Sequence, residues 1–119
     1  MKEYGGYLEW ENYDGPEYHD GYRVDSVRSA LIYTIQKRGY THIWLPYYIC
    51  DCFRVLLEKL RIPFSYYHID SSFLPILPES LPKSHCVLLV NYYGQLKEAD
   101  IQKISSRYAV FQDNTQAFF

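Results

Sequence analysis

The chain has 119 residues, of which 48% are hydrophobic and 22% are charged. This balance excludes an intrinsically disordered protein, and the length fits one compact domain because it is too short for two domains with full cores. The formal net charge of -2 comes from interspersed acidic and basic residues, so the chain lacks the basic surface that binding to nucleic acid requires.

Residues 1–23 are rich in tyrosine, glycine and acidic residues, a composition typical of a loop. Within this segment, residues 7–10 alternate in polarity and predict a short edge strand. The hydrophobic periodicity of a folded domain begins at residue 24. We therefore expect an N-terminal segment, 1–23, followed by an α/β domain, 24–119.

Helices and strands are expected to alternate through this domain. From residue 24 the apolar residues recur at helical spacing, with Asp25 or Ser26 suited to cap the helix and Gly39 to end it. The same reasoning predicts helices over 49–60 and 96–107 and strands over 43–45, 64–69, 86–90 and 108–112. Pro46 is expected to stop the first strand. The proline-rich stretch 70–83 is expected to be a surface connection with one helical turn.

The continuous apolar run over 86–90 is typical of a strand buried on both faces of a parallel sheet. Alternating strands and helices then predict right-handed crossovers and a three-layer α/β sandwich with a mostly parallel sheet. In such a sheet ligands bind beyond the carboxyl ends of the strands. Polar and aromatic residues follow the predicted strands there, at 46–50, 91–94 and 113. The first helix begins near the same edge, and its N-terminus is suited to a phosphate.

Tyrosine and cysteine give two further expectations. The adjacent tyrosine pairs at 47–48, 66–67 and 92–93 are each expected to place one ring in the core and one on the rim. The three cysteines are an odd number, and no signal-like segment opens the chain, which favours a cytoplasmic protein. No apolar run reaches the roughly 20 residues of a transmembrane helix, which favours a soluble one. A metal or redox site at Cys50, Cys52 and Cys86 is a further alternative, although no histidine or second cysteine pair completes a tetrahedral set at matching spacing.

Three short motifs occur in an order that points to one family. Residues 110–117, Val-Phe-Gln-Asp-Asn-Thr-Gln-Ala, are similar to the Glu-Asp-Ala-Ala-Gln-Ala signature of the DegT/DnrJ/StrS-type nucleotide-sugar aminotransferases. Residues 90–95 resemble that family's Val-His-Leu-Tyr-Gly segment, and residues 25–31 its Ser-Gly-Thr-x-Ala-Leu helix start. The stretch 45–50 stands where the family has a loop led by proline, so the resemblance covers nearly the whole chain from about residue 5.

The resemblance implies the N-terminal part of the large domain of a fold-type I enzyme dependent on pyridoxal 5'-phosphate (PLP). It also implies a homo-oligomer whose complete form transfers an amino group onto a keto-sugar nucleotide. Asp113 would pair with the pyridine nitrogen of PLP, and Gln116 would lie near the ring hydroxyl. Arg28 and Ser29 would hold the phosphate, and Cys50 falls where the family places an aromatic ring that stacks on the cofactor.

The chain departs from the family pattern at three positions. Val27 replaces a glycine beside the phosphate, Cys50 lacks a ring, and Asn91 stands in for a histidine. The family's Schiff-base lysine lies downstream of the segment that ends at residue 117, so the chain alone is expected to be inactive. A non-catalytic α/β module that binds a partner or ligand is the competing hypothesis. An unrelated flavodoxin-like domain, which would bind flavin rather than PLP, is a third.

Overall fold

The computed structural model describes residues 26–115, which form a five-stranded sheet with three α-helices. The sheet order is β3-β2-β1-β4-β5, and all neighbouring strands are parallel except β2 and β3, which are antiparallel. The strands are β1 His42–Pro46, β2 Phe64–Ile69, β3 Pro75–Ile76, β4 His85–Val90 and β5 Ala109–Asp113. The expected strand at 7–10 lies outside the described residues.

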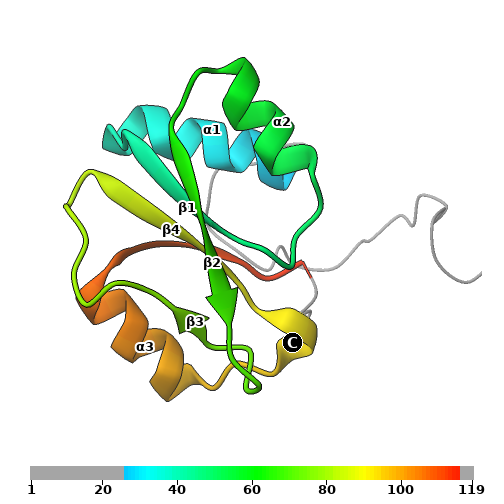
Figure 1. The fold of residues 1–119 in the computed structure, drawn as a ribbon, viewed down its shortest axis with the longest axis vertical. Helices are drawn as coiled ribbons and strands as arrows, with labels where there is room; N and C mark the ends of the chain where they lie inside the picture. The colour runs from blue at the N-terminus through cyan, green and yellow to red at the C-terminus, as the bar shows by residue number, and fades with distance from the viewer. Residues whose placement is uncertain (1–25, 116–119) are drawn as a thin grey trace, which may run out of the picture.

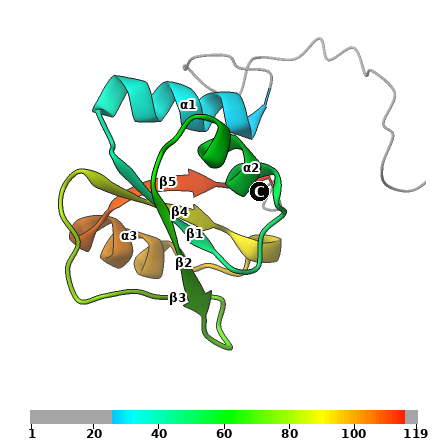
Figure 2. The ribbon, with the colours of Figure 1, turned by 45° about the horizontal axis from the view of Figure 1, so that its top comes forward.

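The helices cover both faces of the sheet. Helices α1 (Val27–Arg38) and α2 (Cys52–Lys59) lie on one face, and α3 (Glu98–Arg107) lies on the other, as Figures 1 and 2 show from two directions. The molecule is therefore a three-layer α/β sandwich with a mostly parallel sheet. This architecture confirms the fold class predicted from the alternation of strands and helices.

The larger part of the core fills the space between the sheet and helices α1 and α2. Eight side chains there are at most 6% exposed: Leu31, Ile35, Ile43, Leu45, Phe53, Leu57, Cys86 and Leu88. A smaller cluster of Leu89, Leu96 and Ile101 packs between the sheet and α3. Strand β4 contributes alternate residues to both clusters and is buried on both faces, as its apolar run predicts.

Helix α1 begins and ends at the residues expected from its sequence. The Ser26 side chain accepts a hydrogen bond from the Ser29 backbone N–H at 3.1 Å, which is the N-cap interaction. Gly39 adopts a left-handed conformation with φ 70°, a backbone state that glycine enters without a steric cost. Its N–H donates to the Ile35 carbonyl and closes the last turn.

The predicted starts of two helices and the predicted form of one connection were wrong. Helix α2 begins at Cys52 rather than at residue 49, because Ile49 packs against the core from the loop that follows β1. Helix α3 begins at Glu98 rather than at residue 96. The connection 70–83 contains strand β3 instead of a helical turn, and the turn before that strand is held by the Asp70 carboxylate, which accepts the N–H groups of Ser72 and Leu74.

The strand order reverses between β1 and β4. Strand β1 is followed by α2 and then by β2 on one side, whereas β4 is followed by α3 and then by β5 on the other. The two crossover helices lie on opposite faces of the sheet, so the loops that leave β1 and β4 separate from each other (Figure 1). This is the topological switch point at which open parallel sheets form a crevice.

Candidate functional site

A cavity of about 250 Å³ lies at the carboxyl ends of the strands, at this switch point. Its walls come from the start of α1, the loop after β1, the start of α2, the turn after β4 and the end of β5. The lining residues are Val27, Arg28, Tyr48, Ile49, Cys50, Cys52, Phe53, Val90, Tyr92, Asp113 and Thr115. Loops that are distant in sequence therefore meet around one space.

The structure places three of the five sequence-predicted site residues on this cavity. Arg28, Cys50 and Asp113 line it together, although they come from three different elements. Ser29 does not line it, and its N–H is already bonded to the Ser26 side chain. Gln116 lies outside the described residues.

Asp113 supplies a buried carboxylate to the cavity. The residue is 7% exposed and ends β5, where its backbone carbonyl accepts the Asn91 N–H at 3.0 Å. Its Oδ1 atom accepts the backbone N–H of Thr115, also at 3.0 Å. An ionised carboxylate can accept more hydrogen bonds than the one from Thr115, so this position can take a further donor or a cation from a ligand.

Two tyrosines form an aromatic part of the wall. Tyr48 and Tyr92 stack with their ring centroids 5.3 Å apart, and the Tyr92 hydroxyl donates to the Tyr48 carbonyl. Burial raises the pKa of Tyr92 to about 12, with smaller contributions from Tyr48 and from Asp113. The Tyr92 phenol therefore stays protonated at neutral pH and joins the turn after β4 to the loop after β1.

The turn after β4 is shaped by its backbone and by Asn91. Tyr93 takes a left-handed conformation with φ 53°, which is uncommon for a residue with a large side chain, and Gly94 follows with φ 70°. The Asn91 side-chain oxygen accepts the Leu96 N–H at 3.0 Å and holds the far end of the turn. Asn91, where the family pattern has a histidine, thus supports the loop and is absent from the cavity lining.

The prediction of one core and one rim ring for each tyrosine pair holds in part. Tyr92 is 2% exposed and Tyr93 60% exposed, as expected. The pair at 47–48 contradicts the prediction, because both rings are more than half exposed. Sequence reasoning placed Tyr48 and Tyr92 near the rim, with hydroxyls available to a ligand, but it did not show that the two rings stack on each other, because the aromatic signal gives no direction for a side chain in a loop.

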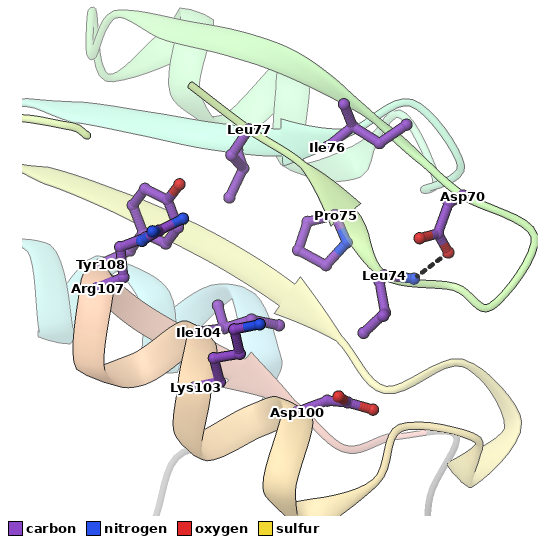
Figure 3. Close-up of a pocket in the computed structure, with 10 residues that line it drawn as sticks. All are labelled: Asp70, Leu74, Pro75, Ile76, Leu77, Asp100, Lys103, Ile104, Arg107 and Tyr108. Carbon is purple, nitrogen blue, oxygen red and sulfur yellow. Dashed lines mark hydrogen bonds between the residues drawn. The ribbon is translucent and has the colours of Figure 1, made fainter. Parts of the chain in front are cut away.

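A second cavity, of about 350 Å³, lies between β3 and α3 (Figure 3). It includes Asp70, whose carboxylate already accepts two backbone N–H groups of its own turn. The cations at its edge, Lys103 and Arg107, are exposed on α3. Among the residues that the structure describes, none of the predicted site residues lines it and no buried charge faces it, so the switch-point cavity is the better candidate.

Two features were sought in the part of the chain that the structure describes: a metal-binding group and a membrane-spanning helix. Within residues 26–115, no group of three or more histidine, cysteine or carboxylate side chains is placed to hold a metal ion. Within the same range, no helix has both the length and the apolar character needed to cross a membrane.

Comparisons with known proteins bear on the fold. No protein-family model matches the sequence, and no curated protein sequence matches it. The structure is similar to the crystal structure of a candidate aminotransferase from Burkholderia pseudomallei, with a TM-score of 0.58 and 15% sequence identity. The likeness covers 76% of this chain and 30% of that one. The chain thus has an aminotransferase-like fold and spans less than a third of that structure.

Proposed function

We propose that the switch-point cavity binds pyridoxal 5'-phosphate and that the chain contributes this part of the site to an aminotransferase of the DegT/DnrJ/StrS sugar type. The observation that carries the proposal is the meeting of Arg28, Cys50 and Asp113 on one cavity. These residues were selected from motifs far apart in the sequence. An aminotransferase-like fold is the independent support.

The residues around the cavity fit the chemistry of this cofactor. PLP carries a basic ring nitrogen, a flat aromatic ring and a phosphate. The buried carboxylate of Asp113 suits the protonated nitrogen, the guanidinium of Arg28 suits the phosphate, and the exposed ring of Tyr48 offers aromatic surface. Tyr48 can thus supply the ring that Cys50 lacks.

Each residue has a defined task in the proposed site. PLP, when bound, supplies an electron sink for the carbon next to the transferred amino group. Asp113 keeps the proton on the ring nitrogen, because its buried carboxylate is an acceptor with little competition from water. Arg28 orients the phosphate. Tyr92 fixes the position of the Tyr48 loop by its hydrogen bond to the Tyr48 carbonyl.

Catalysis requires a lysine that the described residues do not bring to the cavity. Lys37, Lys59, Lys83, Lys97 and Lys103 are all absent from its lining. In our proposal this chain binds the cofactor, and a Schiff-base lysine from outside residues 26–115 completes the site that acts on a keto-sugar nucleotide in the cytoplasm. The absence of a lysine from these walls is also what favours the second candidate, a non-catalytic binding module.

Self-association is a further part of this proposal. Tyr48 and Tyr93 are 58% and 60% exposed beside the cavity, and their hydroxyl oxygens are 3.2 Å apart. A second copy of the chain would cover these rings. Sedimentation velocity tests this part separately, because a dimer is expected and a monomer at all concentrations would contradict it.

Binding of pyridoxamine 5'-phosphate tests the proposed function. This analogue has the ring nitrogen and the phosphate but no aldehyde, so it does not react with surface lysines. We expect calorimetry to detect binding by the natural chain and at least tenfold weaker binding by Asp113→Asn, which keeps the oxygen that accepts the Thr115 N–H. Asp51→Asn is the matched control, because the Asp51 side chain is 81% exposed.

Three results would overturn the proposal. Absence of binding by the natural chain, or equal binding by Asp113→Asn, would remove the cofactor site and favour the non-catalytic module. Binding of flavin mononucleotide in place of pyridoxamine 5'-phosphate would favour the flavodoxin-like alternative.

A further inference from the structure

Two free cysteines stand side by side on the wall of the cavity. Cys50 and Cys52 flank Asp51 at the start of α2, and both line the cavity. Cys86 is also free but is fully buried in β4. The chain therefore has one pair of thiols that a reagent can reach and one internal thiol that serves as a reference.

The backbone holds the pair at a separation suited to a disulfide. Asp51 has φ -65° and ψ -11°, a helical conformation. A helical residue places the Cα atoms of its two neighbours about 5.4 Å apart, as the rise and radius of the α-helix require. Natural disulfides join Cα atoms about 4.4–6.8 Å apart, so the Cα separation of Cys50 and Cys52 falls within this range.

The two thiols differ in their surroundings. Cys50 is exposed, whereas Cys52 is half-buried. Burial raises the pKa of Cys52, and a hydrogen bond and the charge interaction with Cys50 raise it further, against a smaller opposing effect of Arg28. Because the thiolate is the nucleophile, the exposed Cys50 is the thiol that reacts first with an external partner and Cys52 is the one that resolves the product.

We propose that Cys50 and Cys52 form a redox-active dithiol that exchanges with small-molecule disulfides and closes an intramolecular disulfide on the cavity wall. The Cys50 thiolate attacks one sulfur of the small disulfide, forms a mixed disulfide and releases one small thiol. Cys52 then loses its proton and attacks the Cys50 sulfur, which releases the second small thiol. The protein gives up two protons and two electrons, and the small disulfide is reduced to two thiols.

This proposal goes beyond the proposed cofactor site and stands without it. The reaction changes the wall that carries Cys50 and Cys52, whatever occupies the cavity. The spacing and the accessibility of the two thiols support the reaction, and the mass of the protein reports it.

Incubation with oxidised glutathione followed by intact-mass measurement tests the dithiol. The natural chain is expected to lose two hydrogens and to keep no glutathione. Cys52→Ser is expected to retain one glutathione on Cys50, because the resolving thiol is missing. Cys50→Ser is expected to react at least tenfold more slowly, and Cys86→Ser serves as the control that behaves as the natural chain. Circular dichroism checks that each variant is folded.

The contrary results are distinct from failure of the cofactor site. Retention of glutathione by the natural chain to the same extent as by Cys52→Ser would show that no internal disulfide closes. Disulfide-linked dimers as the main product, or no reaction at Cys50, would equally overturn the proposal. None of these results depends on whether pyridoxamine 5'-phosphate binds.

Discussion

The two ends of the parallel sheet carry different kinds of polar cluster. At the amino end, His42 bonds to the Ser65 hydroxyl at 2.8 Å, and the Trp44 indole N–H donates to His85 Nδ1 at 3.1 Å. The His42 and His85 rings stack with their centroids 4.5 Å apart. At the carboxyl end, Asp113 and Arg28 both line an open cavity.

This difference shows what distinguishes a candidate site from a structural cluster. At the amino end, the side chains hydrogen-bond and stack with one another across three neighbouring strands. Their polar groups therefore stabilise the sheet itself. The carboxyl-end groups lie around the loops after β1 and β4, which leave toward opposite faces of the sheet, so side chains from four separate segments surround a space. The presence of polar residues therefore does not distinguish a ligand site from a structural cluster. The direction in which the adjoining loops leave the sheet makes the distinction.

The largest expected effect comes from the strand that joins the two ends. Leu88 of β4 is fully buried between the sheet and helices α1 and α2. Leu88→Ala is expected to lower the free energy of unfolding by about 3 kcal/mol, because it removes buried methyl groups and leaves a cavity. Chemical denaturation measures this change. Val55→Ala, at a side chain that is 53% exposed, is the control, and equal losses in both variants would contradict the assignment of the core.

A smaller effect is expected from the tyrosine that joins two loops of the carboxyl end. Tyr92→Phe removes the hydrogen bond to the Tyr48 carbonyl and is expected to cost about 1 kcal/mol of folding stability at neutral pH. The pKa of Tyr92 is raised to about 12, so the unfolded chain releases the Tyr92 proton at a lower pH than the folded chain. The stabilising contribution of Tyr92 is therefore present below pH 10 and is lost as the pH rises toward 12.

Denaturation of both proteins between pH 9 and pH 12 measures this contribution. The stability advantage of the natural chain over Tyr92→Phe should shrink above pH 10 and reverse as the pH approaches 12, because a pKa shift of this size costs more than the hydrogen bond contributes, while other groups that titrate in this range, such as Cys86, affect both proteins alike. A difference that stays constant across the range would contradict the assigned shift.

The smallest expected effect belongs to the amino end. Burial, and then the neighbouring His85, lower the pKa of His42 below its usual value of 6.5. The unfolded chain therefore binds more protons than the folded one as the pH falls through 6.5, and stability declines there. Thermal unfolding at pH 7.5 and pH 5.5 should show a smaller decline for His42→Asn than for the natural chain. His68→Asn, at an exposed ring, should decline as the natural chain does.

The sequence was informative where one physical requirement dominates. The apolar run predicted the buried strand β4, and the serine cap and the glycine predicted the two ends of α1. Periodicity and strand order also predicted that Arg28, Cys50 and Asp113 lie at one edge of the sheet. The start of α2 was less predictable, because Ile49 is buried from a loop with the same apolar character as a helical face. The roles of Tyr48 and Tyr92 depend on loop conformation, including the left-handed Tyr93, which the residue types do not reveal.

In our proposal the carboxyl end of the sheet, and not the amino end, binds pyridoxamine 5'-phosphate. Backbone amide chemical shifts of the isotope-labelled chain, recorded during a titration with this analogue, test it most directly. The account predicts that the signals of Arg28, Cys50, Asp113 and Thr115 move, while those of His42 and Ser65 stay in place. Unchanged signals throughout, or shifts confined to the amino end, would contradict it.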